Sequence, residues 1–208
     1  MKFNPKFNYP KSIRAYYNGK RIYDVNDQKL PSVTTILSAT QPAEKRESLQ
    51  RWRDRVGAAA AEKITREATN RGSAMHDFLE KFCLGKLNLD LLGDNSLERQ
   101  MADQIIENGL RNKVSEIYGV EATLFYPNKY AGAADLICNY EGKNSIIDFK
   151  NSSQLRKDEW NTDYYLQLSA YQMAHNKVYG TDIDQGVILV CTKDLMFQRF
   201  VIDSVRLK

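Results

Sequence analysis

The chain has 208 residues, of which 42% are hydrophobic and 27% charged, a composition that supports a packed core and argues against wholesale disorder. Because no uninterrupted apolar run approaches the roughly 18 residues that a membrane span needs, we expect no integral membrane protein. The three cysteines, Cys83, Cys138 and Cys191, are far apart and form no CxxC pair, which disfavours a disulfide scaffold and any cysteine-rich zinc or iron–sulfur site.

The net charge of +4 is unevenly distributed along the chain. Residues 1–66 carry 14 Lys/Arg and 6 Asp/Glu, whereas residues 67–208 carry 16 and 20. A basic first third suggests contact with a polyanion, although a solvated helix surface would look the same. The basic N-terminus has no apolar secretory segment, and Pro5 and Pro10 interrupt any amphipathic transit helix. We therefore expect a bacterial protein, or a phage protein in its host, in the cytoplasm, with a mitochondrial matrix protein as the less favoured alternative.

Turn and cap signals define the elements of the first part of the chain. Residues 14–23 predict a β-hairpin, because Asn18-Gly19 suits a two-residue turn. Ser32 is a candidate cap for a short helix within residues 31–37. The Ala-, Glu-, Arg- and Lys-rich residues 43–70 predict a long helix, which resumes over residues 72–82 after a break.

The second part of the chain changes from helical to β-rich. The pair Asn95 and Glu98 predicts the start of another helix, ending near Gly119. A helix over residues 163–179 ends before Gly180. Short β-prone runs make up the rest, at residues 120–126, 130–140, 144–150, 184–192 and 196–205. This order predicts an α/β fold with a mixed central β-sheet flanked by helices and an N-terminal helical elaboration.

The densest chemical signal is Gly132-x-x-Asp135 followed by Asp148-x-Lys150. Residues two apart in a strand share a face, so Asp148 and Lys150 point the same way. Asp135 lies on the preceding strand, so two carboxylates and one ammonium can converge. Such carboxylates can hold Mg²⁺, and the lysine can orient water or stabilise charge, as a metal-assisted phosphodiester hydrolase requires. The alternative is a surface strand with a weak ion pair.

Four further residues could join this constellation. His76 shares a helix face with Gly72, and Gln167 shares one with Tyr171. Glu121, at the start of the preceding strand, could add a carboxylate. Each also has an ordinary structural interpretation, as a packed helical His, an amphipathic helix face or an exposed Glu.

Taken in order, these motifs resemble the RecB-like branch of the PD-(D/E)XK nuclease superfamily. Within it, residues 31–37, Trp52 and residues 165–171 resemble the mitochondrial genome maintenance exonucleases and related phage exonucleases. The resemblance spans roughly residues 31–175. The Pro of the superfamily's first motif is replaced here by Ala134, which is usual for the RecB-like branch.

The resemblance implies a restriction-endonuclease-like core and a single nuclease domain over residues 1–208, with a hairpin and helical part (1–118) and a catalytic sheet core (119–208). It implies a DNA exonuclease that uses Mg²⁺ or Mn²⁺ on single-stranded ends. Asp135 and Asp148 would bind metal, Lys150 would be the catalytic lysine and His76 a further ligand. Gln167 and Tyr171 would position the site and the DNA. Relatives with an iron–sulfur cluster use four cysteines, so none is expected here.

Binding of single-stranded DNA needs cations for phosphates and aromatic faces for bases. Our candidates are the basic residues Lys45, Arg46 and Arg53 and the aromatic residues Trp52, Tyr16 and Tyr17. We expect a monomer that acts in DNA replication, recombination or degradation, with proteins of those processes as partners. The alternatives are a structure-selective endonuclease for flaps or junctions, and a non-catalytic DNA-binding subunit.

Overall fold

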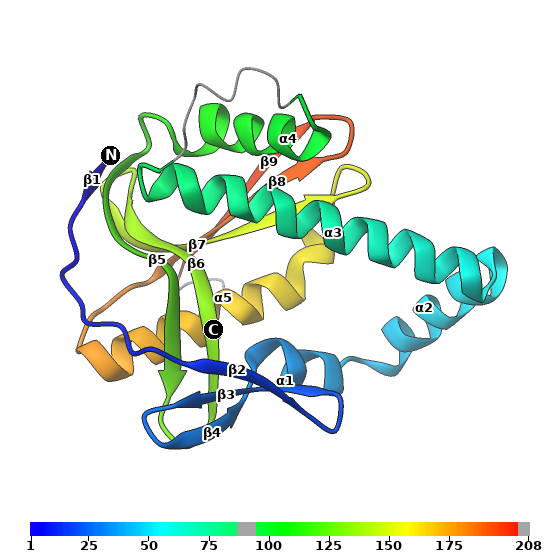
Figure 1. The fold of residues 1–208 in the computed structure, drawn as a ribbon, viewed down its shortest axis with the longest axis horizontal. Helices are drawn as coiled ribbons and strands as arrows, with labels where there is room; N and C mark the ends of the chain where they lie inside the picture. Colours follow the sequence, from blue (N-terminus) through cyan, green and yellow to red (C-terminus); the bar gives the residue numbers. More distant parts are fainter. Residues whose placement is uncertain (87–94, 204–208) are drawn as a thin grey trace.

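A six-stranded mixed sheet, in the order β1-β5-β6-β7-β8-β9, forms the centre of the molecule (Figure 1). The structure is a computed structural model that describes residues 1–86 and 95–203. The β1/β5 and β7/β8 pairs are parallel, and the other neighbours are antiparallel. The strands are β1 (Lys2–Phe3), β5 (Val114–Tyr126), β6 (Tyr130–Tyr140), β7 (Lys143–Ser152), β8 (Gln185–Thr192) and β9 (Phe197–Ile202).

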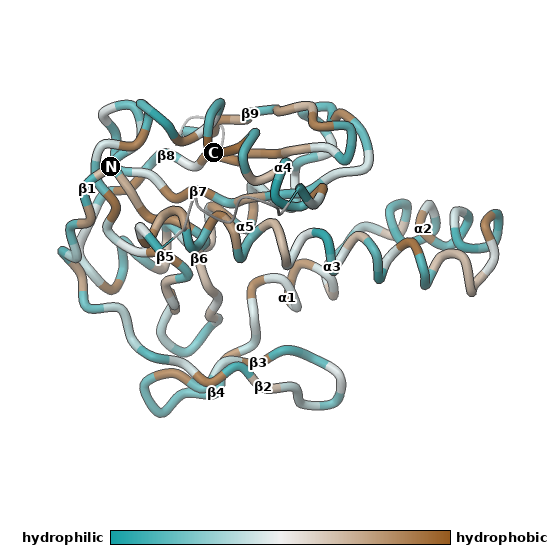
Figure 2. The backbone as a smooth tube through the Cα atoms, turned by 45° about the horizontal axis from the view of Figure 1, so that its top comes forward, coloured by the Kyte–Doolittle hydropathy of each residue, from teal (hydrophilic) through white to brown (hydrophobic). Residues whose placement is uncertain are grey.

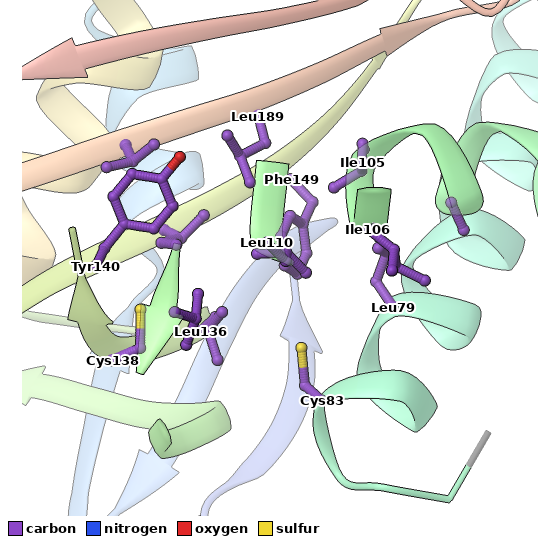
Figure 3. Packing of buried hydrophobic residues seen from close by; sticks show 14 of the residues in the cluster. Leu79, Cys83, Ile105, Ile106, Leu110, Leu136, Cys138, Tyr140, Phe149 and Leu189 are labelled. Atoms are coloured by element: carbon purple, nitrogen blue, oxygen red, sulfur yellow. The ribbon is translucent and has the colours of Figure 1, made fainter. Parts of the chain in front are cut away.

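Helices cover both faces of this sheet, which confirms the predicted α/β fold. Helices α3 (Ala58–Cys83) and α4 (Leu97–Ile105) pack on one face, and α5 (Thr162–Tyr179) packs on the other while connecting the parallel strands β7 and β8. Strand alternation divides the core, because Phe149 faces α3 and α4 whereas Ile146 faces α5. Figure 3 shows the first of these layers, with Leu79, Ile105, Leu110, Leu136, Phe149 and Leu189 in one cluster.

The N-terminal part forms a second, three-stranded sheet of β2 (Ile13–Tyr17), β3 (Lys20–Val25) and β4 (Gln28–Pro31). The predicted hairpin is confirmed, because β2 and β3 pair through a turn at Asn18 and Gly19, both of which have positive φ. The predicted cap is confirmed as well. The Ser32 hydroxyl accepts the N–H of Thr35 at 3.0 Å, at the start of α1 (Val33–Ala39).

The predicted break between residues 70 and 72 is wrong. The chain breaks instead at Gly57, whose φ of 85° separates α2 (Ala43–Val56) from α3. Helix α3 continues through Gly72, which packs closely on β7: a Cβ there would lie 2.5 Å from the side-chain amide nitrogen of Asn151. Figures 1 and 2 show α2 as a mostly hydrophilic helix projecting from the body. None of its residues, all described by the structure, is buried.

The helix predicted to end near Gly119 is shorter than expected. Its cap is Ser96, α4 ends at Ile105, and a π-helical turn, η1 (Ile106–Leu110), follows. Asn112 then adopts a φ of 61°, and β5 begins at Val114. The boundary expected at 118/119, between the hairpin and helical part and the catalytic sheet core, therefore falls inside β5. Of the strand predicted for residues 196–205, residues 204 and 205 lie outside the described residues.

Within residues 1–86 and 95–203, no helix has both the length and the apolar character that crossing a membrane requires.

Candidate active site

Strands β6 and β7 separate at the site. Their antiparallel ladder ends at the pair Leu136↔Ile147. Beyond that pair, the Asp135 side chain replaces a strand–strand hydrogen bond, because its Oδ2 accepts the backbone N–H of Phe149 at 2.6 Å. The Asp135 carboxylate therefore lies in the opening between the two strands. It is held there by the backbone of β7, the strand that carries Asp148.

Asp148 and Lys150 lie on the β7 face opposite Phe149 and form an ion pair. Asp148 is almost fully buried, and its Oδ1 also accepts the side-chain amide of Gln167 at 3.1 Å. The same amide lies 3.3 Å from the hydroxyl of Tyr171, one turn further along α5. The α5 face that carries Gln167 and Tyr171 thus supports the orientation of Asp148.

Gly132 makes room for this support. A Cβ on Gly132 would lie 2.5 Å from Cε1 and 2.7 Å from the hydroxyl oxygen of Tyr171. Because real side chains do not approach that closely, only glycine allows the Tyr171 ring to lie against β6. The glycine of the Gly132-x-x-Asp135 motif therefore acts on the site through α5.

His76 reaches the site from α3. Its Nε2 lies 2.9 Å from the carbonyl oxygen of Phe149, and since a carbonyl only accepts, Nε2 donates. Nδ1 then faces Asp135 and lies 3.6 Å from its Oδ1. In the neutral imidazole this tautomer leaves a lone pair on Nδ1, as a metal ligand requires.

Glu121 completes the cluster from β5. The neighbouring pairs Val120↔Leu136 and Ala122↔Ala134 place it opposite Asp135, yet its φ is 46°, a left-handed conformation within a strand. Such strained residues are concentrated at functional sites. One ligand atom each from His76, Glu121 and Asp135 lies within 4.8 Å of the others. Asp148 lines the same pocket but is outside this three-residue cluster.

The pKa values reflect the burial of several charged groups in one pocket. Burial raises the pKa of Asp148 to about 6, against the opposing effect of Lys150. Burial raises the pKa of Glu121 to about 7, and the charge of Asp135 adds to this. Burial alone would lower the pKa of His76, but Asp135 raises it to about 8. A bound cation would offset both the burial of these carboxylates and the repulsion between Glu121 and Asp135, so the donor set suits a divalent metal.

The pocket at these residues has a volume of about 240 Å³ and is strongly polar. Sequence reasoning missed the part of its wall that the N-terminal sheet and α1 supply. These residues are Arg14, Arg21, Tyr23, Ser32 and Thr34. The hairpin register, which follows from the Asn18-Gly19 turn, would have grouped the first three on one face, but only the folded structure shows that this face lines the site.

The residues expected to bind DNA lie outside this pocket. Lys45, at the base of α2, forms an ion pair with Asp163 of α5. Arg53 lines a hollow of about 650 Å³ between α2 and α3. The others are Arg46, exposed on α2, the half-buried Trp52, and Tyr16 and Tyr17, both exposed on the hairpin.

No family model matches the chain. Its curated relatives include proteins from Mus musculus, Homo sapiens and Xenopus tropicalis, each named Mitochondrial genome maintenance exonuclease 1. The mouse protein is 32% identical over 176 residues, the human protein 27% over 173 and the frog protein 28% over 176. These matches cover 79% of this chain and 50%, 50% and 49% of the relatives, so the chain spans about half their length. The similarity supports a nuclease family.

The same names contradict the expected cytoplasmic location in a bacterium, because they refer to mitochondrial genome maintenance. That expectation rested on the composition of the N-terminal residues. In the structure these residues pack on the body, where β1 pairs with β5 and the rings of Phe7 and Tyr9 contact His175. Their sequence therefore reflects packing and does not indicate a compartment.

Proposed function

We propose that this chain is a metal-dependent nuclease of the RecB-like PD-(D/E)XK type, which hydrolyses phosphodiester bonds of single-stranded DNA from its ends. The observation that carries the proposal is the meeting of His76, Glu121 and Asp135, with ligand atoms within 4.8 Å, in the pocket that also holds Asp148 and Lys150. The similarity to proteins named as exonucleases supports the reaction class.

His76, Glu121 and Asp135 would hold the cation, with Asp148 as an adjacent carboxylate. Carboxylate oxygens suit Mg²⁺ and Mn²⁺, and a single imidazole is compatible with Mn²⁺. When bound, such an ion polarises a phosphoryl oxygen and lowers the pKa of a coordinated water. The hydrogen bond from Nε2 of His76 to the Phe149 carbonyl fixes the tautomer that presents Nδ1 to the cluster.

Lys150 supplies positive charge to the pocket. Burial alone would lower its pKa, but Asp148 and Asp135 raise it, so the ammonium stays protonated at neutral pH. A protonated lysine cannot act as a base, and its role is to stabilise negative charge that develops on the phosphoryl oxygens. Gln167 and Tyr171 act as positioning residues through Asp148.

Cleavage of end-labelled single-stranded DNA tests the proposal. We expect degradation with Mg²⁺ or Mn²⁺, none with EDTA, and loss of activity in Asp148→Ala. Lys143→Ala is a matched control, because Lys143 is exposed on the same strand. An Asp148→Ala protein with full activity would reject the proposed site.

Two alternatives have distinct outcomes in related assays. Cutting of circular single-stranded DNA would indicate an endonuclease, the class to which the flap- or junction-selective alternative belongs. Calorimetric titration with Mn²⁺, with and without Asp135→Asn, tests a non-catalytic DNA-binding subunit, which would bind DNA without binding the metal. Action as a monomer, with proteins of DNA replication or recombination as partners, remains part of the proposal.

The basic residues of α2 are proposed as further DNA contacts, and their surroundings in the folded chain differ. The ammonium of Lys45 is already paired with Asp163, whereas Arg53 faces the hollow between α2 and α3. We therefore expect Arg53→Ala to reduce the salt dependence of DNA binding more than Lys45→Ala does.

A further inference from the structure

Two arginines and two tyrosines alternate on one face of the N-terminal hairpin. The register pairs Arg14 with Tyr23 and Tyr16 with Arg21. Residues two apart on each strand share a face, so all four side chains lie together. The guanidinium carbon of Arg14 lies 5.7 Å from the Tyr23 ring centroid, and that of Arg21 lies 6.0 Å from the Tyr16 ring centroid.

This hairpin face borders the candidate active site. Arg14, Arg21 and Tyr23 line the pocket that contains Asp148 and Lys150. Arg21 also lines a second hollow of about 350 Å³, between the hairpin and α1. Both hollows share Arg21 and Thr34, so they adjoin. The remaining residues of the second hollow are Tyr16, Gly19, Lys20, Thr35, Ser38 and Ala39.

The second hollow is cationic and rich in hydroxyl groups. Among the described residues that line it, Lys20 and Arg21 are basic and none is acidic. Neither Arg14 nor Arg21 forms an ion pair with a carboxylate in the described ranges 1–86 and 95–203. The Arg21 guanidinium donates a hydrogen bond to the Tyr16 hydroxyl, at 3.5 Å. Its charge is therefore available to an external anion.

The backbone of Arg21 is held firmly for this purpose. Its carbonyl oxygen accepts the N–H of Ser32 at 3.1 Å and the hydroxyl of Thr35 at 3.2 Å. These bonds tie the hairpin to the start of α1 and fix the distance between Arg21 and the hydroxyl groups on that helix. Because the backbone that carries the guanidinium is fixed beside hydroxyl donors, only the Arg21 side chain has to be ordered when a phosphate binds.

We propose that Arg21, with Thr34 and Ser38, binds the phosphate next to the scissile one, and that Tyr16 stacks on the adjoining base. The inference rests on the proposed function and gives the substrate strand a direction, out of the active site across the hairpin. Guanidinium groups match the geometry of phosphate oxygens, and exposed aromatic rings stack on bases of any sequence. Tyr16 is 67% exposed, so its ring is accessible to a base.

Salt-dependent binding of a fluorescent oligothymidylate tests this subsite, with cleavage blocked by Asp148→Asn in every protein. Arg21→Ala should lower the slope of log affinity against log salt by about 0.7, the value for one phosphate contact on a single strand. Tyr16→Ala should weaken binding about tenfold with little change in slope, since stacking releases no counterion. Lys29→Ala is the control, because Lys29 lies opposite Asp24 in the strand register and therefore on the other face of the same sheet.

Arg21→Gln repeats the test if Arg21→Ala does not fold, as judged by thermal unfolding. A slope equal to that of the Asp148→Asn parent in the folded Arg21 variant would overturn the subsite. If the wild-type chain still cleaves labelled DNA in that case, the proposed function stands and only the subsite fails. If the slope falls as expected but the wild type cleaves nothing, the binding surface stands and the nuclease proposal fails.

Discussion

The Asp135 carboxylate accepts the backbone N–H of Phe149 at 2.6 Å, where the ladder between their two strands ends. This bond gives Asp135 two functions. It replaces a missing strand–strand hydrogen bond, and it leaves the other oxygen facing His76, with 3.6 Å between Oδ1 and Nδ1. The same residue therefore maintains the fold and contributes to the cluster of candidate ligands.

Substitutions at Asp135 should separate these functions. Asp135→Asn keeps an acceptor for Phe149 but removes the charge, so it should retain more metal-free stability than Asp135→Ala while Mn²⁺ binding is lost. Asp135→Ala leaves the N–H without its partner and should cost about 1–3 kcal/mol of unfolding free energy. Urea denaturation in EDTA and calorimetry with Mn²⁺ measure the two effects. Equal stability of the Ala and Asn variants would contradict the structural role.

The site could be predicted from sequence wherever its residues obey a local period. Strand alternation placed Asp148 and Lys150 on one face, and the helical period placed Gln167 and Tyr171 on another. Both pairs are observed together at the pocket. Short-range geometry determines these relationships, so they can be read before the fold is known.

The rest depends on contacts between distant segments. The left-handed conformation of Glu121 has no sequence signal, because glutamate rarely adopts it. The pairing of Lys45 with Asp163 joins residues 118 positions apart. Gly57 breaks the helix, whereas Gly72 lies within a continuous helix and allows close packing. Composition does not distinguish these two uses of glycine.

Lys150→Met should uncouple charge stabilisation from metal binding. Loss of the ammonium should lower the cleavage rate by about 100-fold, the order of magnitude for one preorganised electrostatic group. Binding of Mn²⁺ should persist or strengthen, because a competing positive charge has left the pocket. Single-turnover cleavage and calorimetry test this prediction. A variant that loses both activity and Mn²⁺ binding would assign Lys150 to the integrity of the metal site instead.

Gly132→Ala should disturb the site indirectly, through Tyr171 and Gln167 of α5. The added methyl group would overlap the Tyr171 ring, at a cost of about 1–3 kcal/mol for overpacking. Activity should also fall, because displacement of Tyr171 moves Gln167 away from Asp148. In a Tyr171→Ala background the same substitution should cost much less, since the overlapping ring is absent. Additive costs in urea denaturation would show that the two residues do not interact.

His175 should make the fold sensitive to acid. Its ring is buried, with Nδ1 2.7 Å from the Thr181 hydroxyl and Nε2 3.1 Å from the Tyr9 hydroxyl. Burial lowers its pKa from 6.5 to about 4. Between these values the unfolded chain binds more protons than the folded one, so stability is lost as the pH falls from 6.5 to 4.

His175→Gln isolates this effect, because glutamine is polar but does not titrate. We expect the unfolding free energy of the wild type, relative to that of the variant, to increase as the pH rises from 4 to 6.5. Above pH 6.5 the difference between the two proteins should stay constant. His76, whose pKa is raised, titrates at higher pH in both proteins and cancels from the difference. Parallel profiles across the acidic range, measured by urea denaturation, would show that the folded protein tolerates a charged His175 and that the aromatic cluster around it admits water.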